Sequence, residues 1–98
     1  MNIDRIMNGD ELTLALEGRL DTLTAPELED IIRNGLGGVE KLVLDFEKLD
    51  YISSAGLRVL LLAEKIMSRL GGMRVLHVNE TVMEVFEVTG FTDVITIE

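Results

Sequence analysis

Several residue types are scarce or missing in this 98-residue sequence, and each absence excludes a class of site. There is no cysteine, which excludes disulfide bonds and thiolate metal sites. His77 is the only histidine, so it has no second histidine or cysteine with which to form a metal cluster. We therefore expect no metal site and no cofactor. No Ser-His-Asp order, P-loop or glycine-rich nucleotide-binding motif is present either, so nothing in the sequence indicates an enzyme.

Basic residues are outnumbered by acidic ones. The chain has 9 lysines and arginines against 18 aspartates and glutamates, which gives a net charge of −9. Phosphate backbones and anionic lipid surfaces attract basic proteins. We therefore expect no binding to nucleic acid and no direct binding to membranes.

Long hydrophobic runs are also absent. The longest, Val59–Ala63, is far shorter than the roughly 20 residues that cross a bilayer as a helix. The N-terminal Met1–Arg5 lacks the basic and then apolar layout of a signal peptide. Hydrophobic residues nevertheless make up 47% of the chain, which is enough for one core at this length. We expect a cytoplasmic protein with a single domain over residues 1–98.

The order of the expected elements predicts an α/β fold. Asn8-Gly9-Asp10 is a strong turn signal between two strands, and the apolar run Leu42-Val43-Leu44 indicates a strand buried on both faces. The predicted elements are strands over 3–7 and 12–18, a helix from 24 to about 34, a strand over 41–45, a helix from 54 to about 70, a strand over 73–78, a helix over 79–89 and a strand over 94–97. This β-β-α-β-α-β-α-β order implies a mixed sheet with an N-terminal hairpin and crossover helices.

Two serines, Ser53 and Ser54, stand where the central strand leads into the long helix. Serine is a favoured N-cap, because its hydroxyl accepts a hydrogen bond from an unpaired backbone N–H of the first helical turn. A phosphate is also well tolerated at such a place, because these N–H groups and the helix dipole favour negative charge. Local chemistry alone favours the simple cap.

Residues Tyr51–Arg58, which read Tyr-Ile-Ser-Ser-Ala-Gly-Leu-Arg, resemble the signature of STAS domains, the fold of the anti-sigma factor antagonists. Members of that family carry Asp-Ser-Ser/Thr-Gly-Leu at the start of this helix, and the first serine is the phosphoacceptor. Aligning Gly56-Leu57 with the Gly-Leu of the family places Ser54 on that serine, with Ser53 as the alternative acceptor. Ser53 stands where the family usually has aspartate, and Ala55 replaces the second Ser/Thr.

Two further segments resemble the family in the right order. Gly18–Asp21 is similar to its Gly-x-Leu/Ile-Asp loop before the first helix, and Val85–Phe91 to its third helix and glycine stop. The resemblance implies an anti-sigma factor antagonist whose unphosphorylated form binds an anti-sigma factor with serine kinase activity and so releases a sigma factor. Serine phosphorylation would switch it off, and a serine phosphatase would reset it. The alternative is a non-phosphorylated STAS adaptor subunit of a membrane-transport or other signalling complex.

One face of the long helix is expected to meet the partner. At about 100° per residue, a side chain cluster forms around the serine, consisting of Ser54, Arg58, Leu61, Leu62, Lys65 and Arg69. The opposite side should enter the core with Val59, Leu60, Ala63, Ile66, Met67 and Leu70. The two leucines on the serine face are then surplus to the core, and either a neighbouring element covers them or they form a docking patch. The predicted partner-binding residues are Asp21, Ser53, Gly56, Arg58, Leu61, Leu62 and Lys65.

Three aspartates have competing interpretations. Asp21 either caps its own turn or, by the resemblance, contacts the partner kinase, and both interpretations stay open. Asp45 and Asp50 flank the end of the central strand and could suggest a phosphoaspartate receiver domain. The first strand lacks the acidic pair of a receiver, however, and no lysine follows the last strand. We therefore expect Asp45 and Asp50 to be solvated loop residues, and His77 to be an ordinary strand side chain.

Overall fold

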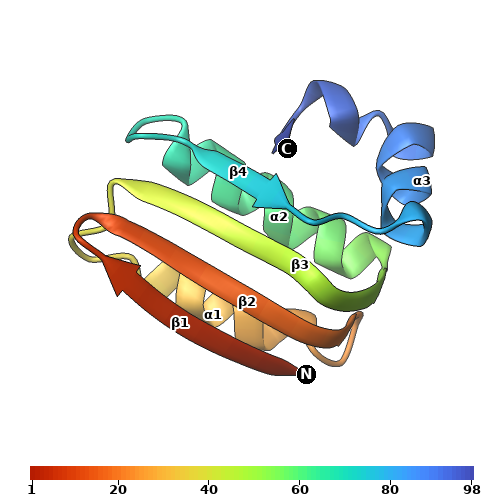
Figure 1. Cartoon of the computed structure of the whole chain (residues 1–98), viewed down its shortest axis with the longest axis horizontal. Helices are drawn as coiled ribbons and strands as arrows, with labels where there is room; N and C mark the ends of the chain where they lie inside the picture. The colour runs from red at the N-terminus through yellow and green to blue at the C-terminus, as the bar shows by residue number, and fades with distance from the viewer.

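A five-stranded mixed sheet forms the centre of the molecule, and a computed structural model describes all residues from 1 to 98 (Figure 1). The strands lie in sequence order, with β1 antiparallel to β2 and every later pair parallel. The elements are β1 (Asn2–Asn8), β2 (Glu11–Leu20), α1 (Ala25–Asn34), β3 (Lys41–Ile52), α2 (Ser54–Met67), β4 (Met73–Leu76), α3 (Glu80–Thr89), the 3₁₀-helix η1 (Phe91–Asp93) and β5 (Thr96–Ile97). The predicted order and fold class are confirmed, and η1 is an addition.

The central strand β3 is much longer than predicted, since it runs for 12 residues. Its register with β2 explains why the prediction ended too early. Ala15 lies opposite Asp45, whereas Glu17 lies opposite Lys48, so two residues of β2 span three of β3. β3 therefore holds one extra residue here and a second between Leu49 and Tyr51, which lie opposite Gly18 and Arg19. Such β-bulges interrupt the alternation of inward and outward side chains. Because of this interruption, the alternating pattern that predicts a strand does not continue into the second half of β3. Asp45 and Asp50 lie within β3, so their prediction as loop residues was wrong.

Helices α1 and α2 cover one face of the sheet, and the core lies between the two layers (Figure 1). Strand β2 contributes Leu12, Leu14 and Leu16, each no more than 2% exposed. At the carboxyl end of the sheet, α3 packs through Phe86, whose ring stacks on Phe46 of β3 with 6.4 Å between the ring centroids. No helix lies over the opposite face of the sheet (Figure 1).

Helix α2 ends at Met67, earlier than predicted. The residues of the predicted core stripe that are buried are Val59, Leu60, Ala63 and Met67. Ile66 is half-buried and packs against the core. Leu70 is 46% exposed, so its prediction as a core residue was wrong. It lies in the turn beyond the helix, where helical spacing no longer decides which side chains point inward. None of the helices has the length and hydrophobicity needed to cross a membrane.

The two C-terminal strands are shorter than predicted. β4 ends at Leu76, so His77 lies just beyond it and is not a strand residue. His77 is also the only non-glycine residue with a positive φ, at 59°, a conformation that L-residues with a Cβ adopt rarely. Because η1 occupies Phe91–Asp93, β5 starts at Thr96 and not at Val94.

Candidate functional site

The serine pair lies at the junction of β3 and α2, where Ser53 is the N-cap and Ser54 the first helical residue. The backbone N–H of Ser53 donates to the carbonyl of Leu20 over 2.9 Å, which fixes the end of β3 beside the end of β2. The hydroxyl of Ser53 makes no capping hydrogen bond and is buried without a partner. Ser54 is exposed. Only the Ser54 hydroxyl is therefore open to a modifying enzyme.

The start of α2 favours an added anion at Ser54. The first N–H groups of an α-helix have no acceptor within the helix, and the N-terminus carries a partial positive charge. No acidic residue stands in the first turn of α2. One turn further along, Arg58 is exposed and adds a full positive charge. A phosphate on Ser54 would thus meet unpaired donors and a cation, with no carboxylate on its own turn.

Gly56 lies inside the molecule, beneath the serine pair. A Cβ atom at this position would approach Ile52 Cγ1 and Leu20 Cγ to 2.8 Å each. Both neighbouring side chains are fully buried, with exposed fractions of 0% for Leu20 and 1% for Ile52. Gly56 was predicted among the partner-binding residues, but its burial leaves it no surface to offer. Its role is to let the first turn of α2 pack closely on the ends of β2 and β3.

Asp21 holds the loop between β2 and α1 in shape. Its Oδ1 accepts hydrogen bonds from the N–H groups of Leu23 at 3.0 Å and Thr24 at 3.2 Å. Its own N–H donates to the Thr24 hydroxyl over 2.9 Å. Desolvation would raise the pKa of Asp21, but the bonds from Thr24 and Leu23 and the charge of Arg19 outweigh it and lower that pKa. The geometry thus shows the turn role, and a contact between Asp21 and a partner stays a prediction.

Three residues near the serine pair were not predicted from the sequence. Leu23, at the tip of the Asp21 loop, is 86% exposed. The only signal for it was a large apolar residue in an otherwise polar segment. Arg19 and Tyr51 are paired across β2 and β3, and the guanidinium carbon of Arg19 lies 4.5 Å from the centre of the Tyr51 ring. Arg19 also lies 3.7 Å from Asp21, so it links the loop to the end of β3.

The two leucines on the serine face of α2 differ from each other. Leu62 is half-buried and packs against the core, so the prediction that it is surplus to the core was wrong. Leu61 is half-buried too, but it is not among the side chains that pack against that core. Arg58 and Lys65 are exposed on the same side. The exposed strip of α2 therefore consists of the exposed Ser54, Arg58 and Lys65 together with Leu61, which is half-buried but does not pack on the core.

Titratable groups away from the serine pair also have shifted pKa values. In Glu64 of α2, burial raises the pKa, and the carboxylate oxygen Oε2 has no hydrogen-bond partner. In Asp45, partial burial would raise the pKa, but the hydrogen bonds with His77 and with the N–H of Glu47 lower it overall. The same contact, 2.8 Å between His77 Nδ1 and Asp45 Oδ1, raises the pKa of His77. It joins β3 to the segment that follows β4.

These features define a small α/β domain that presents an exposed serine hydroxyl at the N-terminus of a helix, above a glycine packed on the sheet. The chain belongs to the STAS domain family, whose model matches residues 2–98. The resemblance found in the sequence is therefore confirmed, and it extends over the whole sheet.

Relatives and solved structures agree with this membership. The chain is 40% identical over 85 residues to the Bordetella bronchiseptica protein BtrV, which is described as an anti-sigma factor antagonist, and the match covers 85% of this chain and 73% of BtrV. An anti-sigma factor antagonist from Mycobacterium paratuberculosis has the same fold, with a TM-score of 0.88 and 20% identity over 98% of this chain and 83% of that one. The Bacillus cell fate determinant SpoIIAA, solved in its phosphorylated form, superposes with a TM-score of 0.76 at 20% identity over 99% of this chain and 91% of that one.

Proposed function

We propose that this protein is an anti-sigma factor antagonist that is switched by phosphorylation of Ser54. The observation that carries the proposal is the contrast between the two serines, since Ser54 is exposed at the start of α2 while the hydroxyl of Ser53 is buried. The unphosphorylated protein binds an anti-sigma factor with serine kinase activity in the cytoplasm and so releases a sigma factor. A serine phosphatase reverses the modification. The protein itself acts by binding and performs no catalysis.

The switch works by blocking a surface. A phosphate adds roughly −1.5 to −2 charges and three strong acceptor oxygens. At the centre of an interface this causes repulsion and a large desolvation cost. At the N-terminus of α2 the same group is tolerated by the fold, because anions at exposed helix N-termini are typically favourable by about 0.3–1 kcal/mol. Phosphorylation therefore changes binding without unfolding the domain.

The docking surface is the exposed strip of α2 together with the tip of the Asp21 loop. Arg58 and Lys65 supply positive charge on a protein whose net charge is −9, which favours an acidic surface on the partner. Leu61 on the helix and the exposed Leu23 at the loop tip supply apolar contact. Three predicted residues support this surface. Asp21 stabilises the loop, Ser53 fixes the end of β3, and Leu62 packs α2 on the core.

Mapping the phosphorylated residue tests the proposal. The protein and its Ser53→Ala and Ser54→Ala variants are each incubated with ATP and the serine-kinase anti-sigma factor of the same organism, and the products are mapped by mass spectrometry. We expect phosphate on Ser54 in the parent and in Ser53→Ala, and none in Ser54→Ala. Ser53→Ala is a matched control, because it removes a buried hydroxyl that makes no hydrogen bond. Phosphate on Ser53, or no phosphate on the parent, would contradict the assignment.

A binding measurement separates the switch from the adaptor. Ser54→Asp should melt within a few degrees of the parent but lose affinity for the anti-sigma factor, because the added charge sits at the interface. The adaptor alternative predicts no effect of this change on complex formation. It is not favoured, since the relatives described above are anti-sigma factor antagonists.

A further inference from the structure

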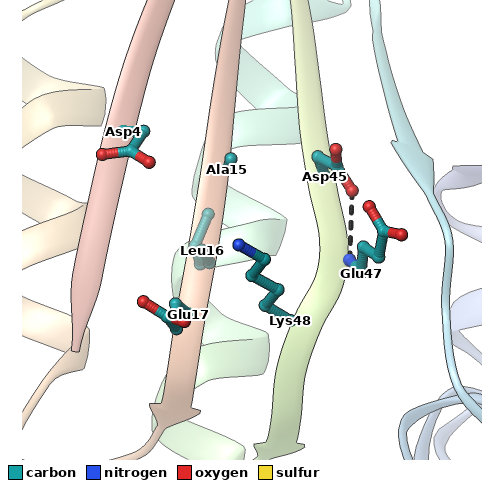
Figure 2. A pocket seen from close by; sticks show the side chains of 7 residues that line it. All are labelled: Asp4, Ala15, Leu16, Glu17, Asp45, Glu47 and Lys48. Carbon is teal, nitrogen blue, oxygen red and sulfur yellow. Dashed lines mark hydrogen bonds between the residues drawn. The ribbon is translucent and has the colours of Figure 1, made fainter.

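Asp45, Glu47 and His77 form a cluster in the middle of β3, beside the carboxyl end of β4 (Figure 2). Asp45 and Glu47 belong to β3, and His77 follows Leu76, the residue of β4 that lies opposite Asp45. One candidate ligand atom from each of the three side chains lies within 4.8 Å of the other two. The sheet register thus brings together residues that are 32 positions apart in the sequence.

Two backbone irregularities hold this cluster together. The first bulge in β3 leaves Glu47 and Lys48 both exposed, although they are consecutive. The N–H of Glu47 donates to Asp45 Oδ1 over 3.0 Å, and Figure 2 shows the two carboxylates side by side on the strand. His77 has the left-handed φ of 59°, and its Nδ1 lies 2.8 Å from Asp45 Oδ1. The fold therefore sets the positions of the Asp45 and His77 side chains and of the Glu47 backbone.

The surroundings of the cluster carry an excess of negative charge. The shallow hollow beside it, about 190 Å³ in volume, is lined by the carboxylates of Asp4, Glu17, Asp45 and Glu47 and by a single cation, Lys48 (Figure 2). No helix covers this face of the sheet, so the hollow is open to ions from solution (Figure 1). Surfaces lined by one sign of charge concentrate counter-ions.

We propose that Asp45, Glu47 and His77 form a binding site for a divalent transition-metal ion of the Zn²⁺ type. An imidazole with two carboxylates suits zinc and cobalt, whereas magnesium and calcium prefer oxygen ligands alone. His77 Nδ1 and Asp45 Oδ1 are hydrogen-bonded at 2.8 Å, whereas two ligands of a tetrahedral ion at about 2.0–2.2 Å lie roughly 3.4 Å apart. The ion would therefore replace this hydrogen bond, and the two side chains would separate by about 0.6 Å to hold it. The sequence-based expectation of no metal site considered only histidine and cysteine, and here carboxylates supply the other two ligands.

A bound ion would tie β3 to the segment that leads into α3. The next anchor of that segment is Asn79, whose side chain accepts from the N–H of Val82 and donates to the carbonyl of Leu49, each over 2.8 Å. The ion binds the assembled cluster and not the unfolded chain, so binding stabilises the fold by mass action. The site is independent of the modification of Ser54.

The test uses the full chain, stripped of metal with EDTA and desalted. Zn²⁺ is titrated in by isothermal titration calorimetry, and Co²⁺ by visible absorption, which reports the coordination geometry of the bound ion. We expect one saturable site, a higher melting temperature with Zn²⁺ than without, and at least a tenfold loss of affinity in His77→Asn. Asparagine is chosen because it adopts the left-handed conformation more readily than other residues. Asp50→Asn, which changes an exposed acid of the same strand outside the cluster, is the matched control and should bind as the parent does.

Three results would overturn the proposal. The first is no saturable heat or absorption change in the parent. The second is equal affinity in the parent and in a folded His77→Asn variant, which would mean that the ion binds only to scattered surface carboxylates. The third is an equal loss in Asp50→Asn, which would indicate an effect of net charge. Circular dichroism of each variant shows that it is folded, and Glu47→Gln, which changes an exposed side chain, provides a second ligand variant.

Discussion

Replacing Gly56 with alanine will destabilise the domain, although alanine is the better helix former. The added Cβ would lie 2.8 Å from both Ile52 Cγ1 and Leu20 Cγ, whereas ordinary van der Waals contact begins at 3.4 Å. Neither neighbour can move into solvent, because Leu20 is 0% and Ile52 1% exposed. The first turn of α2 must therefore retreat from the sheet by several tenths of an ångström.

The two opposing effects can be compared in magnitude. Inserting a methyl group into a packed core typically lowers the free energy of unfolding by about 1–3 kcal/mol. Replacing glycine with alanine in a helix raises it by up to about 1 kcal/mol. The cost of the clash exceeds the gain in helix propensity, so we expect a net loss of roughly 1 kcal/mol in the free energy of unfolding. For a domain of this size that lowers the melting temperature by about 4–8 °C.

Thermal unfolding followed by circular dichroism measures this loss. Gly37→Ala is the matched control, because a Cβ there has no atom within 4 Å, and it should melt close to the parent. The double variant Leu20→Ala with Gly56→Ala should cost less than the sum of the two single changes, since the new methyl group then occupies vacated space. A Gly56→Ala variant that melts as high as the parent, or two effects that simply add, would refute the explanation by close packing.

Three further predictions concern stability and binding. Burial raises the pKa of Glu64, so the folded protein binds that proton more tightly than the unfolded chain and loses stability as the pH rises through the interval between the two pKa values. Glu64→Gln should melt higher than the parent at pH 7 and no differently below about pH 4, and a gap that persists in acid would contradict this cause. Asn79→Ala removes the N-cap of α3 and leaves the Leu49 carbonyl without its hydrogen-bond donor. Urea unfolding should show a loss of about 1–2 kcal/mol in the free energy of unfolding, and an unchanged midpoint would contradict this. Leu61→Ala should keep the parent's melting temperature but weaken binding to the anti-sigma factor. Leu62→Ala should instead lower the melting temperature, because Leu62 packs on the core. The reverse pattern would show that Leu61 is not part of the docking surface.

Local signals predicted the fold well. The turn at Asn8-Gly9-Asp10 and the glycine that ends α3, Gly90 with a φ of 78°, act through their own backbone conformations, so the sequence reveals them directly. The serine pair is of the same kind, because a strand end and a helix start stand next to each other in the chain. The second half of β3 could not be predicted, since Glu47-Lys48 breaks the alternating pattern and only pairing with β2 shows that the strand continues.

The parts of the site that were missed depend on long-range contacts. The contact between Asp45 and His77 exists only because Leu76 of β4 pairs with Asp45 of β3, and no local pattern reports that register. The burial of the Ser53 hydroxyl and the packing of Gly56 on Leu20 arise in the same way, where α2 meets two strands. Helical spacing placed Leu61 and Leu62 on one face, but it could not show which of them a neighbouring element covers.

The loop held by Asp21 has a consequence for the evolution of parallel signalling pathways. Its base is closed by hydrogen bonds within the loop, from Leu23 and Thr24 to Asp21, so its shape does not depend on which side chains stand at the tip. Thr22 and Leu23 can therefore change between duplicated copies of such a protein without disturbing the neighbouring serine. Of the two parts of the proposed docking surface, the strip of α2 also carries the serine, whereas the loop tip can change independently of it. One or two substitutions in the loop would then be enough to separate two pathways.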